Sequence, residues 1–365
     1  MKPSHLHIAL LLAGICAAGT GQAQTGSYQF INLGGGSAAG INDLGQVVGQ
    51  TSLGATLWNG TTATVLAGGP GSYASAINNA GLIVGGSNSY NSSPVYGSGK
   101  PVEWTGTAQA PLQVGLGGNG WAYGINQSGQ VVGNANGNAA TWSSDNIPTG
   151  LPVSVLAYRI SGTGINNAGQ AAGYVDSGSS YYAVSWSGAN GSKGTLLPSL
   201  GGSFSQADAI NNKGAIVGQS TNTAGALYAT EWNGGSATEL QSLGGQRSYA
   251  YGINDAGVIV GSSTNTAGQV FATLWNGTSA VNLNNYLTPA EKQAGWVLTE
   301  ATGINQNGWI IGDAVNTRSG SSDAFELRVS PVPEASTWAM LLAGLALIGA
   351  LTRFKPTQVR TTPTS

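Results

Sequence analysis

The feature that most constrains this chain is a short motif, Ile-Asn-x-x-Gly, which recurs seven times and begins at Ile41, Ile77, Ile125, Ile165, Ile210, Ile253 and Ile304. The 263 residues from Ile41 to Ile304 make six intervals of about 44 residues each. That period falls in the range of four-stranded propeller blades. The repeat therefore predicts a single repeat domain, although 365 residues would ordinarily suggest two or more domains.

The best-formed repeat, residues 248–283, divides at its turn signals into four short strands, which we expect at 249–253, 258–260, 270–275 and 280–283. An Asn-Asp-Ala-Gly turn joins the first two strands, and Asn276-Gly277, a strong hairpin signal, joins the last two. Tight turns of this kind favour an antiparallel meander over a parallel solenoid. The sequence thus predicts an all-β fold, a seven-bladed β-propeller of four-stranded antiparallel blades.

Two strand positions have a distinctive composition. The first strand of each repeat is rich in small residues, which predicts that it lies innermost, where the sheets converge. The Asn of each motif is then interpreted as a turn former beside the axis, with a ring of liganding carboxamides as the alternative. The third strand carries an aromatic residue, interpreted as inter-blade packing or as a sugar-stacking platform, at Trp58, Trp104, Trp142, Trp186, Trp232, Trp275 and Phe325.

The start of the mature chain completes the last repeat. That repeat ends with its third strand, 324–329, whereas 28–35 resembles the fourth-strand segments 239–245 and 196–202. We therefore expect the N-terminal strand to close the last blade, so that no open sheet edge remains. Longer connections are expected at 143–152 and 87–100 as candidate binding loops or plain tolerated loops, and a short capped helix at 288–295.

Residues 1–23 have the pattern of a secretory signal peptide, with Lys2 before the apolar run 8–18 and small residues at 21–23. Its removal would also remove His5, His7 and Cys16, the only histidines and the only cysteine. Residues 24–331, the propeller, then have no Ser-His-Asp triad, no disulfide and no zinc site with Cys or His ligands. Their 8 basic and 13 acidic residues give a net charge of −5, which disfavours nucleic acid as a partner.

Residues 332–355 differ in composition from the repeats. Pro333, Glu334 and Ala335 precede an apolar run from Trp338 to 351, and Arg353 and Lys355 follow. Counted over 336–352, the run is close to the length of a membrane-spanning helix, and the basic residues would hold 356–365 in the cytoplasm.

This tail resembles the PEP-CTERM sorting signal of Gram-negative bacteria, with Ala335 where the family has a second proline. The resemblance implies recognition by an exosortase, cleavage near the motif, and delivery to the cell surface or the extracellular polysaccharide matrix.

The repeats resemble the extracellular repeats of the HAF family in three segments: 243–245 (Leu-Gly-Gly), 253–261 and 271–275. The histidine of the family name is missing, and its place is occupied or adjoined by Tyr182, Tyr228, Val270 and Asp323. The resemblance implies a repeat architecture and secretion, and it brings no established activity.

The leading hypothesis is a surface-sorted protein, not an enzyme, that binds or organises extracellular polysaccharide and needs no cofactor or metal. The alternative is a carbohydrate-active enzyme with paired carboxylates at a propeller mouth, for which the candidates are Asp43, Asp208, Asp255, Asp313 and Glu300. Asp43 and Asp255 occupy a turn position held by Asn or Gln in other copies, which indicates interchangeable turn residues. Calcium binding by the Asn and Asp turns is a third reading, disfavoured because no Asp-x-Asp-x-Asp run is present.

Overall fold

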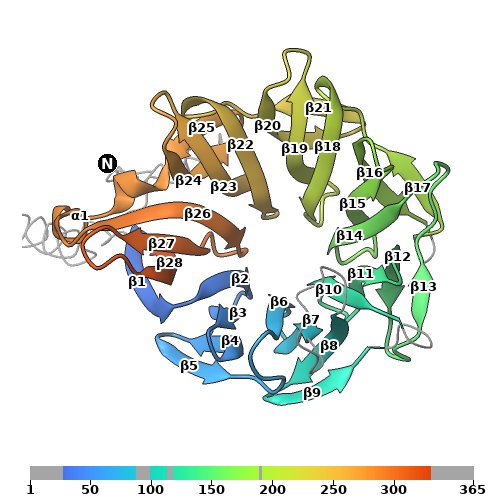
Figure 1. Cartoon of the computed structure of the whole chain (residues 1–365), viewed down its shortest axis with the longest axis horizontal. Coiled ribbons are helices and arrows are strands. Elements are labelled where there is room, and N and C mark those ends of the chain that lie inside the picture. Colours follow the sequence, from blue (N-terminus) through green and yellow to red (C-terminus); the bar gives the residue numbers. More distant parts are fainter. Residues whose placement is uncertain (1–27, 88–98, 113–117, 189–190, 330–365) are drawn as a thin grey trace, which may run out of the picture.

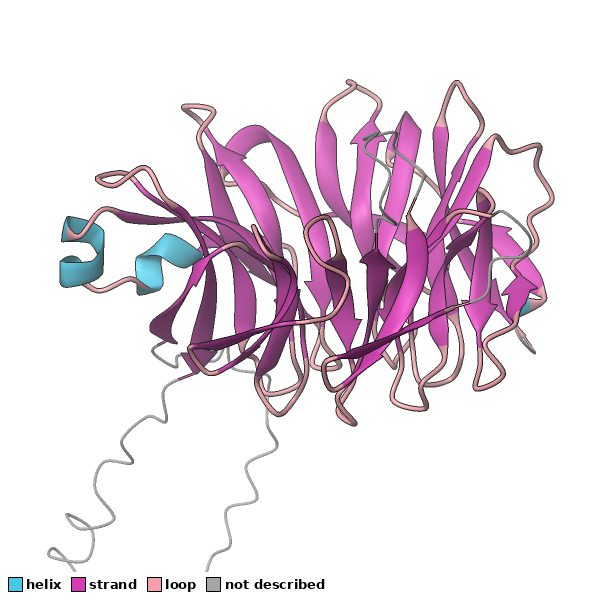
Figure 2. Ribbon diagram, turned by 60° about the horizontal axis from the view of Figure 1, so that its bottom comes forward, coloured by secondary structure: helices cyan, strands magenta, loops and turns pink. Residues whose placement is uncertain are grey.

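A computed structural model describes residues 28–87, 99–112, 118–188 and 191–329 of the chain. Its sheets stand like blades around a central axis (Figure 1) and are built almost entirely of strands (Figure 2). Five sheets have four antiparallel strands each. A sixth path consists of two four-stranded meanders, β18–β21 and β22–β25, joined by a single parallel residue pair between Leu227 and Arg247. The predicted all-β, propeller-like fold is confirmed.

Each meander runs outward from the axis. The innermost strands are β2 (Ser37–Ile41), β6 (Tyr73–Ile77), β10 (Gly120–Ile125), β14 (Arg159–Ile165), β18 (Gly201–Ile210), β22 (Gly244–Ile253) and β26 (Trp296–Ile304). The second strands are β3 (Gln46–Thr51), β7 (Leu82–Ser87), β11 (Val131–Ala135), β15 (Ala171–Asp176), β19 (Ile216–Asn222), β23 (Val258–Asn265) and β27 (Ile310–Asn316).

The third strands are β4 (Gly54–Asn59), β8 (Lys100–Thr105), β12 (Asn138–Trp142), β16 (Tyr181–Ser187), β20 (Leu227–Asn233), β24 (Val270–Asn276) and β28 (Ser322–Val329). The outermost strands are β5 (Thr62–Val65), β9 (Ala108–Pro111), β13 (Pro148–Gly150), β17 (Lys193–Leu196), β21 (Ser236–Glu239), β25 (Ser279–Asn282) and β1 (Tyr28–Gly35).

The N-terminal strand β1 pairs antiparallel with β28, in the sheet order β1-β28-β27-β26. The predicted closure of the last repeat by the start of the chain is therefore confirmed. Leu33 of β1 is buried in a cluster with Trp58 and Ile311, so this strand contributes to the core as well as to the hydrogen-bonded ladder.

The predicted capped helix is confirmed as α1 (Pro289–Gln293), which follows the 3-10 helix η2 (Leu283–Tyr286). The hydroxyl of Thr288 accepts a hydrogen bond from the Glu291 backbone N–H, and the Glu291 carboxylate accepts one from the Thr288 backbone N–H. Pro289 occupies the first helical position, where its missing N–H costs no hydrogen bond.

Three sequence expectations about strand limits were wrong. The polar stretch 262–265 belongs to β23, because Asn265 starts a second Asn-x-x-Gly turn in which its Oδ1 atom accepts hydrogen bonds from the backbone N–H groups of Ala267 and Gln269. The Leu-Gly-Gly segments at 200–202 and 243–245 lead into the innermost strands β18 and β22 rather than ending outermost ones, whereas the copy at 33–35 ends β1 as expected. Part of the expected connection 143–152 is strand β13.

The core lies between neighbouring sheets. One cluster joins Val260 and Leu274 of one sheet to Leu298, Ile310 and Phe325 of the next. The innermost strands approach so closely that a Cβ atom on Gly40 would lie 2.9 Å from the Cα atom of Ala76 in the neighbouring sheet. Small residues at these positions are therefore a packing requirement.

Candidate functional site

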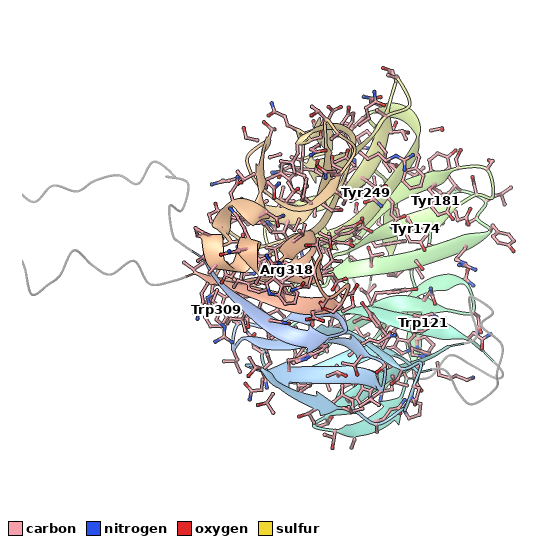
Figure 3. The ribbon with its side chains drawn as sticks, turned by 60° about the vertical axis from the view of Figure 1, so that its left-hand side comes forward. Trp121, Tyr174, Tyr181, Tyr249, Trp309 and Arg318 are labelled. Atoms are coloured by element: carbon pink, nitrogen blue, oxygen red, sulfur yellow. The ribbon has the colours of Figure 1, made fainter. Side chains whose placement is uncertain are left out.

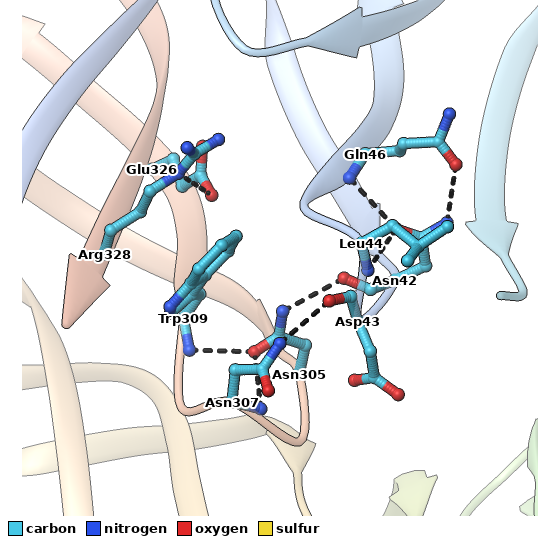
Figure 4. A network of polar contacts seen from close by, with 9 residues as sticks. All are labelled: Asn42, Asp43, Leu44, Gln46, Asn305, Asn307, Trp309, Glu326 and Arg328. Atoms are coloured by element: carbon cyan, nitrogen blue, oxygen red, sulfur yellow. Dashed lines mark hydrogen bonds and ion pairs between the residues drawn. The ribbon is translucent and has the colours of Figure 1, made fainter.

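The seven motif asparagines form a closed hydrogen-bonded ring. The Nδ2 atom of Asn42 donates to the backbone carbonyl of Asn78 at 3.1 Å, and each following asparagine donates in the same way to the next. The last link runs from Asn305 back to the carbonyl of Asn42 at 3.0 Å (Figure 4). The amides are thus used within the protein, so the structure favours the turn interpretation over a ring of liganding carboxamides.

A second ring runs parallel to the first through the residues that follow these asparagines. The backbone N–H of Asn212 donates to Asp255 Oδ1 at 2.8 Å, and that of Gln306 donates to Asp43 Oδ1 at 2.9 Å. The other carboxylate oxygens of Asp255 and Asp43 accept from the side chains of Asn212 and Asn79. Both aspartates are therefore turn residues that join neighbouring repeats, as their positions predicted.

The third-strand aromatics are packing residues: all seven are almost completely buried. The indole Nε1 atoms of Trp104, Trp186, Trp232 and Trp275 donate to backbone carbonyls 34 to 37 residues earlier in the chain, at 2.6 to 2.9 Å. These donations bind four of the third strands to the preceding repeat, and the buried rings of all seven are not available for sugar stacking.

The cavity on the axis is the candidate site. It has two adjoining parts of about 300 and 410 Å³. Each innermost strand contributes the residue two positions before its motif isoleucine, and these residues are Ala39, Ser75, Tyr123, Thr163, Asp208, Tyr251 and Thr302. Tyr73, Gln206 and Glu300, four positions before the isoleucine, and Tyr174 of β15 complete the wall.

The expectation that the innermost strands are made of small residues holds only at alternate positions. Residues that face the next sheet, such as Ala38 and Gly40, are small because the backbones approach closely. Residues that face the axis include large side chains, because a ring of seven strands leaves an open centre. Sequence reasoning missed Tyr73, Tyr123 and Tyr251, which alternation along the strand could have identified.

Three of the five candidate carboxylates lie on or beside this wall. Glu300 and Asp313 are directly opposite one another on β26 and β27. Asp313 accepts hydrogen bonds from the Ser37 hydroxyl at 2.9 Å and from the Ala38 N–H at 3.2 Å, so it also joins the last repeat to the first. Burial raises the pKa of both carboxyl groups, and the Asp313 charge raises the pKa of Glu300 further.

The cavity is electrostatically asymmetric. Burial raises the pKa of Tyr251, and the charge of Glu300 adds to this rise. Burial, then the charges of Asp313 and Glu300, raises the pKa of Tyr73 to about 12. The side containing Tyr73, Asp313, Glu300, Tyr251 and Asp208 therefore carries carboxyl and phenol groups, and no lysine, arginine or histidine is among the described residues that line the cavity.

Asp208 is the most perturbed carboxyl group. Its Oδ1 atom accepts a hydrogen bond from Gln206 Nε2 at 2.8 Å, whereas its Oδ2 atom and Gln219 Oε1 are buried without a hydrogen-bond partner among the described residues. Burial raises the pKa of Asp208 to about 7, against the lowering effect of Gln206 and Gln219. A proton on Oδ2 would remove the negative charge from this buried group.

Asp208→Asn is expected to flatten the pH dependence of stability. The pKa of Asp208 is higher in the folded protein than in the unfolded chain, so its favourable contribution is complete below about pH 4 and is lost as the pH rises through about 7. We expect the variant to be more stable than the wild type at pH 8 by about 2 kcal/mol. This is less than the free energy that the full pKa shift of Asp208 implies at ~1.4 kcal/mol per pKa unit.

Urea unfolding of both proteins at pH 4.5, 6 and 8 measures this effect. Asp145→Asn, a substitution at an exposed turn, is the control. Parallel pH profiles for wild type and Asp208→Asn would contradict the assignment of a raised pKa to Asp208.

The other predicted features lie outside the described residues: the signal peptide 1–23, the sorting motif Pro333, Glu334 and Ala335, the tail residues Trp338, Arg353 and Lys355, and the C-terminal helix. Among the described helices, none has the length and apolarity that a membrane crossing requires. In the same part of the chain, no three His, Cys, Asp or Glu side chains come together as a metal site would need.

Comparisons with known proteins identify the fold. No protein-family model matches the sequence, and a search of curated proteins finds no match. The structure is similar to virginiamycin B lyase from Staphylococcus aureus, with a TM-score of 0.50 and 12% identity over 83% of this chain and 99% of that one. A streptogramin B lyase (TM-score 0.48, 10% identity, 83% and 98% covered) and TolB from Acinetobacter baumannii (0.40, 9%, 67% and 63%) are also similar. At such identities the likeness to the virginiamycin B lyase shows the propeller fold alone.

Proposed function

We propose that this protein is a seven-bladed propeller that binds carbohydrate in its axial cavity at the bacterial surface. The two meanders β18–β21 and β22–β25 count as two blades, because only one residue pair joins them. The closed ring of seven asparagines supports the same count, with one asparagine for each blade.

One observation carries the proposal: the repeats differ where they face the axis. The motif asparagine is the same in all seven repeats, whereas the cavity position two residues before the isoleucine is Ala, Ser, Tyr, Thr, Asp, Tyr and Thr in turn. The fold does not require this variety, since the repeats share one backbone. Aromatic faces beside hydroxyl, amide and carboxyl groups are the combination that binds sugar rings.

The proposed localisation rests on the sequence patterns of residues 1–23 and 332–355. We propose that residues 1–23 direct export, that an exosortase recognises Pro333, Glu334 and Ala335, and that the helix beginning at Trp338 holds the precursor in the inner membrane before cleavage. Arg353 and Lys355 would fix its orientation, with 356–365 in the cytoplasm. Mass spectrometry of the C-terminus of the surface-exposed form tests this; a surface form that retains residues 338–355 would contradict it.

A second candidate function, glycoside hydrolysis, is favoured by one observation. Asp208 and Glu300 line the same cavity and both have raised pKa values, and one protonated and one ionised carboxyl group is what this chemistry needs. Release of new reducing ends from a bound polysaccharide, lost in Asp208→Asn, would establish hydrolysis. Retention of the polysaccharide without cleavage supports the binding role.

Tyr251→Ala is expected to weaken retention of the producing organism's own exopolysaccharide at least tenfold. The substitution removes an aromatic face from the middle of the carboxyl-lined side of the cavity, and stacking on one such ring accounts for about 0.5 to 1.5 kcal/mol, with lost hydrogen bonds adding to it. Affinity electrophoresis of the protein in gels containing the polysaccharide measures the effect.

Tyr158→Ala is the matched control, because Tyr158 is 79% exposed and does not line the cavity. Equal retention of both variants and the wild type would exclude the axial cavity as the binding site. Failure of the wild type to be retained at all would exclude the proposed binding role.

A further inference from the structure

A second cavity, of about 630 Å³, lies at the far end of β22 from the asparagine ring. We call it the β22 pocket; its wall includes Gly245, Arg247, Tyr249, Ser263, Thr264 and Val270. It exists because the pairing of β22 with β23 is interrupted between Gly244 and Ser248. None of the described residues in its wall is acidic.

The neighbouring repeat has the same interruption, between Gly201 and Ser205 of β18, and it provides an internal comparison. There Phe204 stands six residues before the motif isoleucine, where β22 has Arg247. Both backbones are held alike: the Phe204 N–H donates to Thr221 Oγ1 at 3.1 Å, and the Arg247 N–H donates to Thr264 Oγ1 at 3.1 Å. The two repeats thus differ in the side chain and not in the frame that positions it.

The side chains at this position have different surroundings. The ring of Phe204 packs against Tyr181 of the preceding sheet, with ring centroids 5.4 Å apart. Arg247 lies opposite Leu227 of its preceding sheet and is exposed. The ion pair found among the described residues joins Arg328 to Glu326, so Arg247 keeps its charge free of an acidic partner in that part of the chain.

An aromatic pair connects the β22 pocket with the axial cavity. Tyr249 lines the pocket, Tyr251 lines the cavity, and their rings are stacked with centroids 6.0 Å apart and planes 4° apart. Figure 3 shows Tyr249 together with Tyr174, Tyr181 and Trp121, aromatic residues of other sheets. A chain of sugars leaving the cavity would therefore meet a ring face and then a guanidinium group.

We propose that the β22 pocket binds the carboxylate of a uronic acid unit in an acidic polysaccharide, with Arg247 pairing with the carboxylate and Tyr249 lying against the sugar ring. This inference rests on the proposed carbohydrate-binding function and specifies its ligand. Arginine suits the role because its planar guanidinium can form two parallel hydrogen bonds with one carboxylate. The carboxyl groups of the axial cavity would favour neutral units there, so the charged unit belongs at the pocket.

The test compares two hexasaccharides that differ only at C6: β-1,4-linked mannuronic acid and β-1,4-linked mannose. Isothermal titration calorimetry of the wild type is expected to show at least tenfold tighter binding of the mannuronate hexamer, weakening as salt is added because an ion pair is screened. Arg247→Phe reproduces the side chain of the neighbouring repeat, and it is expected to reduce mannuronate binding to the level of mannohexaose.

Two further variants make the result specific. Arg318→Gln removes an exposed arginine from a turn outside the β22 pocket and is expected to bind as the wild type does. Phe204→Arg places the charge in the neighbouring interruption and is expected to increase mannuronate binding by adding a second site.

Equal binding of both hexamers by the wild type, or unchanged mannuronate binding by Arg247→Phe, would overturn the inference while leaving carbohydrate binding intact. If the wild type binds neither hexamer, the inference about the β22 pocket is also overturned. The proposed carbohydrate-binding function is then decided by the retention experiment with the native exopolysaccharide.

Discussion

A variant that lacks residues 1–35 is expected to lose cooperative folding, whereas one that lacks residues 1–27 is expected to fold normally. The two differ only by β1, Tyr28–Gly35, which forms the outermost strand of the sheet that ends the ring. Without it, β28 becomes a free edge along which seven residue pairs are lost. A free edge of this kind can pair with another copy of the chain.

The strand also contributes core contacts that no other segment can replace. Leu33 is 5% exposed and packs with Trp58 and Ile311, and the ring of Phe30 lies 5.5 Å from that of Trp296. Loss of a single buried leucine costs about 3 kcal/mol, so loss of the whole strand with its ladder removes a large part of the 5 to 15 kcal/mol by which domains are ordinarily stable.

Urea unfolding followed by circular dichroism, with light scattering for association, measures this outcome. Addition of a peptide with the sequence 28–35 is expected to restore cooperative unfolding to the shorter protein, because this peptide supplies the missing strand β1 without a covalent link. An unchanged unfolding midpoint in the protein without residues 1–35 would contradict a structural role for β1.

The repeat architecture could be predicted because every repeat contains the same turn residues at the same positions. The motif glycine, such as Gly257 with a φ of 82°, needs a conformation that other residues rarely adopt, and the asparagine needs its side chain in the turn. Seven copies of one turn at a constant period leave few folds to consider. The third-strand tryptophans and the closing strand followed from the same regularity.

The site could not be predicted in the same way because it lies where the repeats differ. Tyr251 and Asp208 occupy one position of the repeat, and only the ring brings that position from all seven innermost strands to one cavity. The motif placed Asp255 in a turn, where it accepts a hydrogen bond from the Asn212 N–H of the neighbouring repeat, but it did not show that Asp208 faces the axis. Whether an aspartate of an innermost strand faces a cavity depends on strand direction and alternation, which the motif alone does not define.

Asn254→Ala is expected to lower the free energy of unfolding by about 3 kcal/mol, and Asn265→Ala by about 1 kcal/mol. The two asparagines begin separate turns of the same Asn-x-x-Gly type and are therefore a matched pair. Asn254 is 2% exposed, its Oδ1 atom accepts from the Val258 N–H at 3.0 Å, and its Nδ2 atom donates to the Asn305 carbonyl of the next repeat at 3.3 Å. Among the described residues, the side chain of Asn265 forms hydrogen bonds with Ala267 and Gln269 of its own turn, and none with another repeat.

The difference between the two losses measures how much one asparagine-to-carbonyl hydrogen bond of the ring contributes to the free energy of unfolding. Alanine at 254 leaves the buried Val258 N–H without its acceptor, at a cost of about 1 to 3 kcal/mol, and it removes the link to the Asn305 carbonyl, which keeps only its bond from the Gly308 N–H. Water can replace the bonds of the more accessible Asn265 turn. Urea unfolding at constant pH measures both variants. Equal losses would mean that the asparagines stabilise their own turns only, and the ring that runs from Asn42 through Asn305 would then be a consequence of the fold. A larger loss at 254 would show that the motif is repeated because each copy connects its repeat to the next.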